Sequence, residues 1–158
     1  MQSGGWSDVT EDIFRLVYHS ETAITGPAEI VDAQIRRILD ASRRNNSRAG
    51  VTGALMFNRG FFAQVLEGER AEVESTFERI QRSPLHRNLV VLQFARAPVR
   101  GFAQWSMAFV GTSQSDRARF GHLALESGFC PGDLDGDALF GLLHDMLMED
   151  ERSLSQTT

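Results

Sequence analysis

The 158-residue sequence lacks lysine: all 16 of its basic residues are arginines. Without lysine, the chain can neither form a Schiff base on its own side chains nor supply the lysine of a phosphate-binding loop. Its single cysteine, Cys130, has no partner for an internal disulfide and indicates a reducing compartment. A Gly-x-Gly-x-x-Gly turn and a His-Glu-x-x-His motif are also absent, and the four histidines are scattered. A standard zinc site is therefore not expected.

Long apolar runs and secretory signals are missing as well. No stretch is long enough to cross a bilayer, and no charged segment followed by an apolar one opens the chain. The formal net charge of −5 argues against nonspecific binding to nucleic acid. With 42% hydrophobic and 23% charged residues, the composition is typical of one globular domain with a short appendage. We therefore expect a cytoplasmic protein that binds neither membranes nor nucleic acid.

The spacing of apolar residues predicts five strands and two helices before residue 111. Strands are expected at about 14–20, 51–57, 61–67, 89–95 and 104–110, and helices from Pro27 to Asn45-Asn46 and from Arg70 to Arg82. Gly68 is expected to end the third strand. Period-two alternation places Trp105, Met107 and Phe109 on one face of the fifth strand.

The order β-α-β-β-α-β-β predicts a ferredoxin-like α+β fold, with one sheet and two helices on one face. The other face also needs cover, because the second and third strands are apolar on both sides. Two C-terminal helices, about 115–126 and 137–149, are expected to supply it. We thus divide the chain into a loose arm (1–11), a domain (12–111) and a helical extension (112–158) that packs on the sheet or at an oligomer interface.

Three amides and a tyrosine stand out as candidate binding residues. Gln64 lies in the middle of a strongly apolar strand, where an amide without partners costs roughly 1–3 kcal/mol. Asn45 and Asn46 are adjacent near the end of the first helix, and Tyr18 is central in the first strand. Amides both donate and accept, so they suit a planar heterocycle. Simpler readings are an exposed edge position for Gln64, a tyrosine at the rim, and asparagines that merely end a helix.

These residues occur in a recognisable series of short motifs. The series is Val17-Tyr18-His19-Ser20, Asn45-Asn46-Ser47-Arg48-Ala49-Gly50-Val51-Thr52-Gly53, Phe62-Ala63-Gln64-Val65-Leu66-Glu67-Gly68 and Trp105-Ser106-Met107. In order and spacing it resembles the BLUF family of blue-light sensors that use flavin. The resemblance covers about residues 13–111, and it implies FAD as cofactor, with FMN possible.

The resemblance also implies roles for individual residues. Tyr18 would donate an electron and a proton to the excited flavin, and Gln64 would rearrange its hydrogen bonds. Trp105 or Met107 would approach Gln64 and report its state. The remaining residues expected to contact the flavin are Ile38 and Ile80 on its two faces, Asn45 and Asn46 at its polar edge, Ser42, Leu55, Arg79 and His86.

By this resemblance the chain is a sensor and not an enzyme, and it signals to a separate partner protein, with homo-oligomers expected. Two alternatives remain open: an acylphosphatase-like phosphate hydrolase on the same fold, and an interaction domain that has lost its flavin. The arginine-rich stretch around the first helix either holds phosphates or forms a solvated face; its members are Arg36, Arg37, Arg43, Arg44 and Arg48.

Overall fold

A computed structural model describes residues 12–58, 61–110 and 135–156. The elements are β2 (Ile13–Thr22), α1 (Ala28–Ala49), β3 (Thr52–Asn58), β4 (Phe61–Glu69), α2 (Arg70–Arg82), β5 (His86–Ala97), β6 (Ala108–Val110) and α4 (Gly136–Gln156). The strands form one mixed sheet in the order β5-β2-β4-β3-β6. All neighbours are antiparallel except β3 and β6. The predicted α+β, ferredoxin-like order of elements is confirmed.

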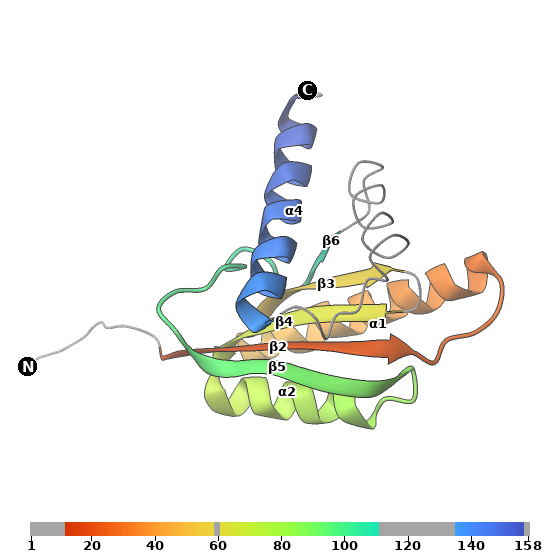
Figure 1. Ribbon diagram of the computed structural model, residues 1–158, viewed down its shortest axis with the longest axis horizontal. Coiled ribbons are helices and arrows are strands. Elements are labelled where there is room, and N and C mark those ends of the chain that lie inside the picture. The colour runs from red at the N-terminus through yellow and green to blue at the C-terminus, as the bar shows by residue number, and fades with distance from the viewer. Residues whose placement is uncertain (1–11, 59–60, 111–134, 157–158) are drawn as a thin grey trace, which may run out of the picture.

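The sheet lies between two helical layers (Figure 1). Apolar side chains of α1 and α2, such as Ile35 and Val73, form one core with Leu66 of β4. On the opposite face, Leu139 and Leu143 of α4 pack with Val65. Because successive residues of β4 point to opposite faces, both faces need cover, and α4 supplies part of it. The helix expected at about 137–149 is thus present, and it runs longer, from Gly136 to Gln156. The other expected helix, 115–126, the N-terminal arm and most of the turn between β3 and β4 lie outside the described residues.

The first helix is longer than predicted. It continues past Asn45-Asn46 to Ala49 and ends at Gly50, which has the left-handed φ of 70°. The N–H groups of Gly50 and Val51 both donate to the carbonyl oxygen of Asn46. A glycine can adopt this conformation at no steric cost, so it ends the helix, and the asparagine pair does not. Both asparagines therefore lie on a regular helix surface.

The prediction that Gly68 breaks the third strand is wrong. β4 runs through Gly68 to Glu69, and α2 begins at the next residue. A Cβ atom at position 68 would lie 3.1 Å from the carbonyl oxygen of Gly50. The glycine thus lets the chain after α1 pass close to β4, and it does so without ending the strand.

The fifth strand is much shorter than predicted. Only Ala108–Val110 pair with β3, and the preceding residues form turns and bends. The expected shared face of Trp105, Met107 and Phe109 is therefore wrong for Trp105. Met107 is buried in the core under α1 and α2, whereas Trp105 packs against the core under α4. Alternation holds only inside a regular strand, and Trp105 and Met107 lie before this one begins.

A buried carboxylate fixes the loop that leads to β6. Glu67 of β4 is fully buried and accepts hydrogen bonds from the backbone N–H groups of Gly101 and Phe102, at 2.9 Å each. Arg15 of β2 donates to it at 2.8 Å and stacks at 3.9 Å on the ring of Phe140 in α4. Both Glu67 oxygens are thus satisfied, and the loop is tied to β2, β4 and α4.

Removing this carboxylate should destabilise the protein strongly. We expect Glu67→Ala to lower the free energy of unfolding by about 3–5 kcal/mol, because it leaves Arg15 without its buried counter-charge. A matched control is Glu74→Ala, whose pair with Arg70 is exposed and 3.5 Å long. That change should cost less than about 1 kcal/mol. Urea denaturation of both variants measures the difference, and equal losses would contradict the structural role of Glu67.

Candidate functional site

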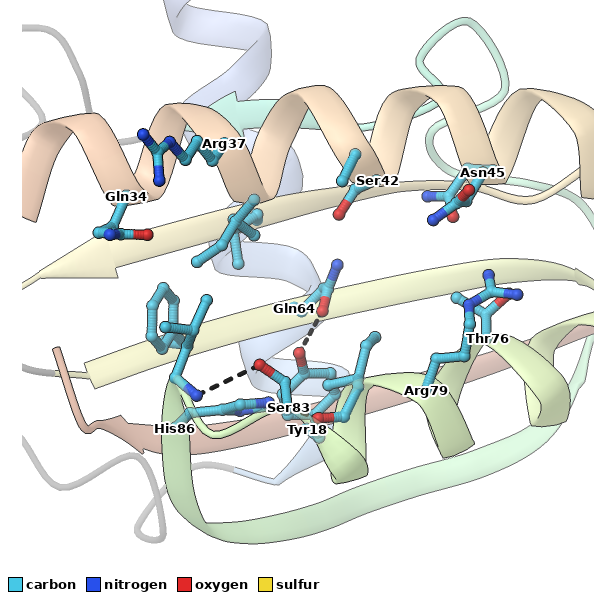
Figure 2. A pocket seen from close by; sticks show the side chains of 17 residues that line it. Tyr18, Gln34, Arg37, Ser42, Asn45, Gln64, Thr76, Arg79, Ser83 and His86 are labelled. Carbon is cyan, nitrogen blue, oxygen red and sulfur yellow. Dashed lines mark hydrogen bonds between the residues drawn. The ribbon is translucent and has the colours of Figure 1, made fainter.

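A cavity of about 440 Å³ opens between α1, α2 and the sheet. Figure 2 shows Gln34, Ser42 and Asn45 of α1 facing Thr76 and Arg79 of α2, with Gln64 between them. The size lies within the range of small-molecule sites. The predicted residues that line it are Tyr18, Ile38, Ser42, Asn45, Asn46, Leu55, Gln64, Arg79, Ile80 and His86. All ten residues expected to contact the cofactor therefore line the same cavity.

Gln64 is the central polar group of this cavity. Its side chain is 3% exposed, and β4 pairs on both sides, with β2 and with β3. The reading of Gln64 as an exposed edge residue is therefore wrong. Its Oε1 accepts a hydrogen bond from the hydroxyl of Tyr18, and its Nε2 donates to Sδ of Met107 at 3.4 Å. Both ends of the buried amide are thus engaged, as its burial requires.

Tyr18 is the only tyrosine of the chain and is 2% exposed. It lies directly opposite Gln64 in the β2–β4 register. Its ring is 5.5 Å from that of Phe77 and 6.3 Å from that of His86. Burial raises the pKa of the Tyr18 phenol above its ordinary value, because the phenolate would lose its hydration. The hydroxyl therefore keeps its proton and acts as the donor to Gln64.

Met107, and not Trp105, reaches Gln64. Met107 is 2% exposed and belongs to the same core as Tyr18. The segment before β6 is held against α1, because Asn46 Nδ2 donates to the carbonyl oxygen of Ser106 at 2.7 Å. Asn46 is itself buried, while Asn45 lines the cavity from a more exposed position. The two adjacent amides therefore have different surroundings.

His86 is anchored by two hydrogen bonds at the entrance to β5. Its Nε2 lies 2.7 Å from the carbonyl oxygen of Ile80, and its Nδ1 lies 2.9 Å from Oγ of Ser20. A carbonyl only accepts, so Nε2 carries a proton. In the neutral ring, Nδ1 then accepts the hydrogen bond of the Ser20 hydroxyl. His86 is thereby oriented by the end of α2 and by β2.

Sequence reasoning missed several residues that line the cavity: Gln34, Arg37, Ala41, Phe62, Thr76, Ser83 and Leu85. Spacing was the available signal, because Gln34 and Thr76 precede Ile38 and Ile80 by four residues and so share their helix faces. Thr76 matters most. Its Oγ1 is buried and has no hydrogen-bond partner among the described residues. A buried hydroxyl of this kind is free to bond a ligand in the cavity.

The arrangement suits a planar ring with one polar edge. Amide groups and a free hydroxyl supply donors and acceptors, while Ile38, Leu55 and Ile80 supply apolar walls. Within the described residues, no group of three or more His, Cys, Asp or Glu side chains could hold a metal ion. In that part of the chain, no helix is long and apolar enough to cross a membrane. The donor set and the orphaned Thr76 hydroxyl therefore fit a flavin.

The raised pKa of Tyr18 should make stability depend on pH in the alkaline range. The folded state holds the phenolic proton more tightly than the unfolded chain, whose tyrosine has a pKa of about 10. The contribution of Tyr18 to stability is therefore constant below about pH 10 and falls above it by up to about 1.4 kcal/mol per pH unit. Without lysine, the other side chain that titrates in this range is Cys130.

Urea denaturation at a series of pH values on a Cys130→Ser background tests this. Tyr18→Phe should show no such decline, because it carries no phenolic proton. An equal decline in Tyr18→Phe would contradict the assignment.

Among known proteins, the chain resembles the blue light- and temperature-regulated antirepressor BluF of Escherichia coli K12. The two are 33% identical over 92 residues, which are 58% of this chain and 22% of the antirepressor. The photoactivated adenylate cyclase subunit beta of Euglena longa is 30% identical over 105 residues, which are 66% of this chain and 12% of that protein. The chain therefore spans a small part of these relatives, and what it shares with them is confined to that part.

Solved structures match over more of their length. The dark-state structure of the BLUF protein BlrB has a TM-score of 0.68 at 28% identity, covering 89% of this chain and 98% of BlrB. The photo-activated state of BlsA has a TM-score of 0.72 at 30% identity, covering 85% of this chain and 94% of BlsA. The fold is thus that of proteins similar in size to this chain.

A family model described as sensors of blue light using FAD matches residues 13–108. The match spans more than half of the chain and includes every residue predicted to form the site. The shared part is a light-sensing domain and not an enzyme, and the comparisons do not favour the hydrolase reading. Because this model matches most of the chain, the chain belongs to the BLUF family of flavin-binding blue-light sensors.

Proposed function

We propose that this chain binds FAD in the cavity between α1 and α2 and senses light through the hydrogen-bond series Tyr18–Gln64–Met107. The observation that carries the proposal is this continuous series, because it links the cavity to the segment before β6. The choice of FAD follows from the family description, which names this flavin.

The side chains around the cavity divide by chemistry. Ile38 of α1 and Ile80 of α2 would cover the two faces of the flavin ring. Asn45, Asn46 and the Thr76 hydroxyl would bond its polar edge. Arg79 and His86 lie at the α2 side, where they would meet the pyrimidine end and the ribityl chain. Each helix would thus contribute both polar groups and an apolar wall to the site.

The flavin, when bound, would supply absorption of blue light and a strongly oxidising excited state. Tyr18 would be the donor, because its hydroxyl is protonated and lies within the cavity wall. It would give up an electron and its proton and then recover both. During this cycle the Gln64 side chain would be able to rotate and form a different set of hydrogen bonds.

Reversal of the Gln64 amide has a definite consequence for Met107. At present Nε2 donates to the thioether sulfur. If the amide exchanged its ends, Oε1 would face that sulfur, which has no proton to donate. The contact between Gln64 and Met107 would then be lost, and the segment before β6 would be freed from the site. We infer that this release is the first step of signalling toward β6 and α4.

The output lies beyond the sensor domain. We propose that residues 12–111 form the light-sensing domain and that residues 112–158 form an extension that passes the signal on. We further propose that the protein acts in the cytoplasm, assembles as a homo-oligomer and contacts a separate signalling protein. Support comes from relatives whose names describe an antirepressor and cyclases, which are regulated systems of different kinds.

The role of the Thr76 hydroxyl can be tested by its isostere. Thr76→Val should weaken flavin binding about five- to tenfold, because one hydrogen bond to the ligand is lost. The same change should raise the stability of the flavin-free protein by about 1 kcal/mol, because a buried unsatisfied hydroxyl is removed. Flavin titration and urea denaturation measure the two effects. Unchanged flavin affinity would show that Thr76 does not bond the cofactor.

The photoactive role of Tyr18 can be tested by the visible spectrum of the flavin bound to the wild-type protein and to a Tyr18 variant. The wild-type protein should bind flavin, shift slightly to the red after blue light and recover in the dark. Tyr18→Phe should bind comparable flavin but show no such shift, because the donor is gone and the ring volume is kept. A Tyr18→Phe protein that still shifts would refute the proposed mechanism. A wild-type protein that binds no flavin would favour the dark interaction domain.

A further inference from the structure

Two side chains of α1 hold consecutive carbonyl groups of the segment before β6. Asn46 Nδ2 donates to the carbonyl oxygen of Ser106 at 2.7 Å, and Arg43 Nε donates to that of Met107 at 2.9 Å. The two donors are three residues apart, so they share one face of the helix. The carbonyl groups of Ser106 and Met107 are thereby engaged by α1 where β6 has not yet begun.

These two donors differ in their relation to the cavity. Asn46 lines it, so a change there would disturb the cofactor site itself. Arg43 does not line the cavity and is largely exposed at the helix surface. Its one hydrogen bond within the described residues goes to the residue whose side chain contacts Gln64. Arg43 can therefore be altered without removing a side chain that lines the cavity.

The contact between the Met107 side chain and Gln64 is too weak to hold the segment in place without the backbone hydrogen bond from Arg43. A thioether sulfur is a weak acceptor, and the 3.4 Å bond from Gln64 is the polar contact of the Met107 side chain. Upstream, the carbonyl of Trp105 accepts from the N–H of Gly53 at 3.1 Å. A slip by two residues that drew this segment into an extended β6 would bring Trp105 to the place of Met107, since side chains repeat with period two within a strand. Such a slip requires Arg43 to release the Met107 carbonyl.

We propose that Arg43 is a positioning residue that selects Met107 over Trp105 as the neighbour of Gln64. The inference rests on the proposed function of this site, but it concerns the placement of the segment and not the photochemistry. Arg43 binds the backbone carbonyl of Met107, so that the methionine side chain stays in contact with the Gln64 amide. Loss of this hydrogen bond lets the segment slip and Trp105 approach the cavity.

The test uses the full chain with methyl-labelled methionine, on a Trp6→Phe background so that Trp105 is the one tryptophan. The Met107 methyl signal, assigned with Met107→Leu, reports the position of the side chain with or without flavin. We compare Arg43→Ala, Arg43→Lys, which keeps an N–H donor and the charge, and Arg44→Ala. Arg44 is the next arginine on α1 and makes no hydrogen bond or ion pair within the described part of the chain.

Arg43→Ala should increase the population with displaced Met107 about fivefold, as expected for one lost hydrogen bond. Trp105 fluorescence in the flavin-loaded protein should fall, and dark recovery should change in rate by a similar factor. Arg43→Lys should restore most of the wild-type behaviour, and Arg44→Ala should match the wild type.

An unchanged Met107 signal in Arg43→Ala overturns the inference, whether or not flavin binds. An equal effect of Arg44→Ala also overturns it, because it would indicate a general effect of helix charge. Absence of a light-induced spectral shift in the wild type would instead refute the proposed function, and the methionine signal would still decide the role of Arg43.

Discussion

A primary amide buried at the centre of a sheet is the constraint on which the site depends. Gln64 lies on a strand paired on both sides and its side chain is 3% exposed, so the amide depends on partners within the protein. One hydrogen-bond partner is Tyr18, on the neighbouring strand β2. The other is Met107, near the C-terminal end of the domain. Because an amide has a donor end and an acceptor end, this pair of partners defines one orientation. Any event that reverses the amide therefore alters contacts on both sides at once.

The segment between β5 and β6 is held from both faces of the sheet. On the face covered by α4, Glu67 binds the N–H groups of Gly101 and Phe102. On the opposite face, Arg43 and Asn46 bind carbonyl groups next to β6. Trp105 lies between these attachments and packs toward α4. The residues from Gly101 to Met107 are thus attached to both helical layers, those of α1 and α4.

The stacking of Arg15 on Phe140 gives α4 a direct link to the same network. Arg15 also donates to Glu67, so one guanidinium contacts the sheet, the loop and the helix. An arginine can serve all three because its planar group stacks and donates at the same time. The chain, which has no lysine, uses arginine at each of these structural contacts. Arg15 therefore connects the loop after β5 with α4, through hydrogen bonds to Glu67 and Val99 and through stacking on Phe140.

The sequence by itself determined the order of elements, the two-sided burial of the central strands and the candidate site residues. Apolar periodicity depends on local geometry, so α2 was predicted at Arg70–Arg82 with its observed bounds. Ten expected residues meet at one cavity because the motifs fix which helix and strand faces carry them.

Only tertiary structure decided that α1 continues to Gly50, that Gly68 stays within its strand and that β6 is short. Those outcomes depend on contacts between distant segments: Gly68 against Gly50, and the carbonyls of Ser106 and Met107 against α1. For the same reason the placement of Met107 next to Gln64 could not be read from alternation, since the α1 side chains that bind this segment lie some sixty positions away in the sequence.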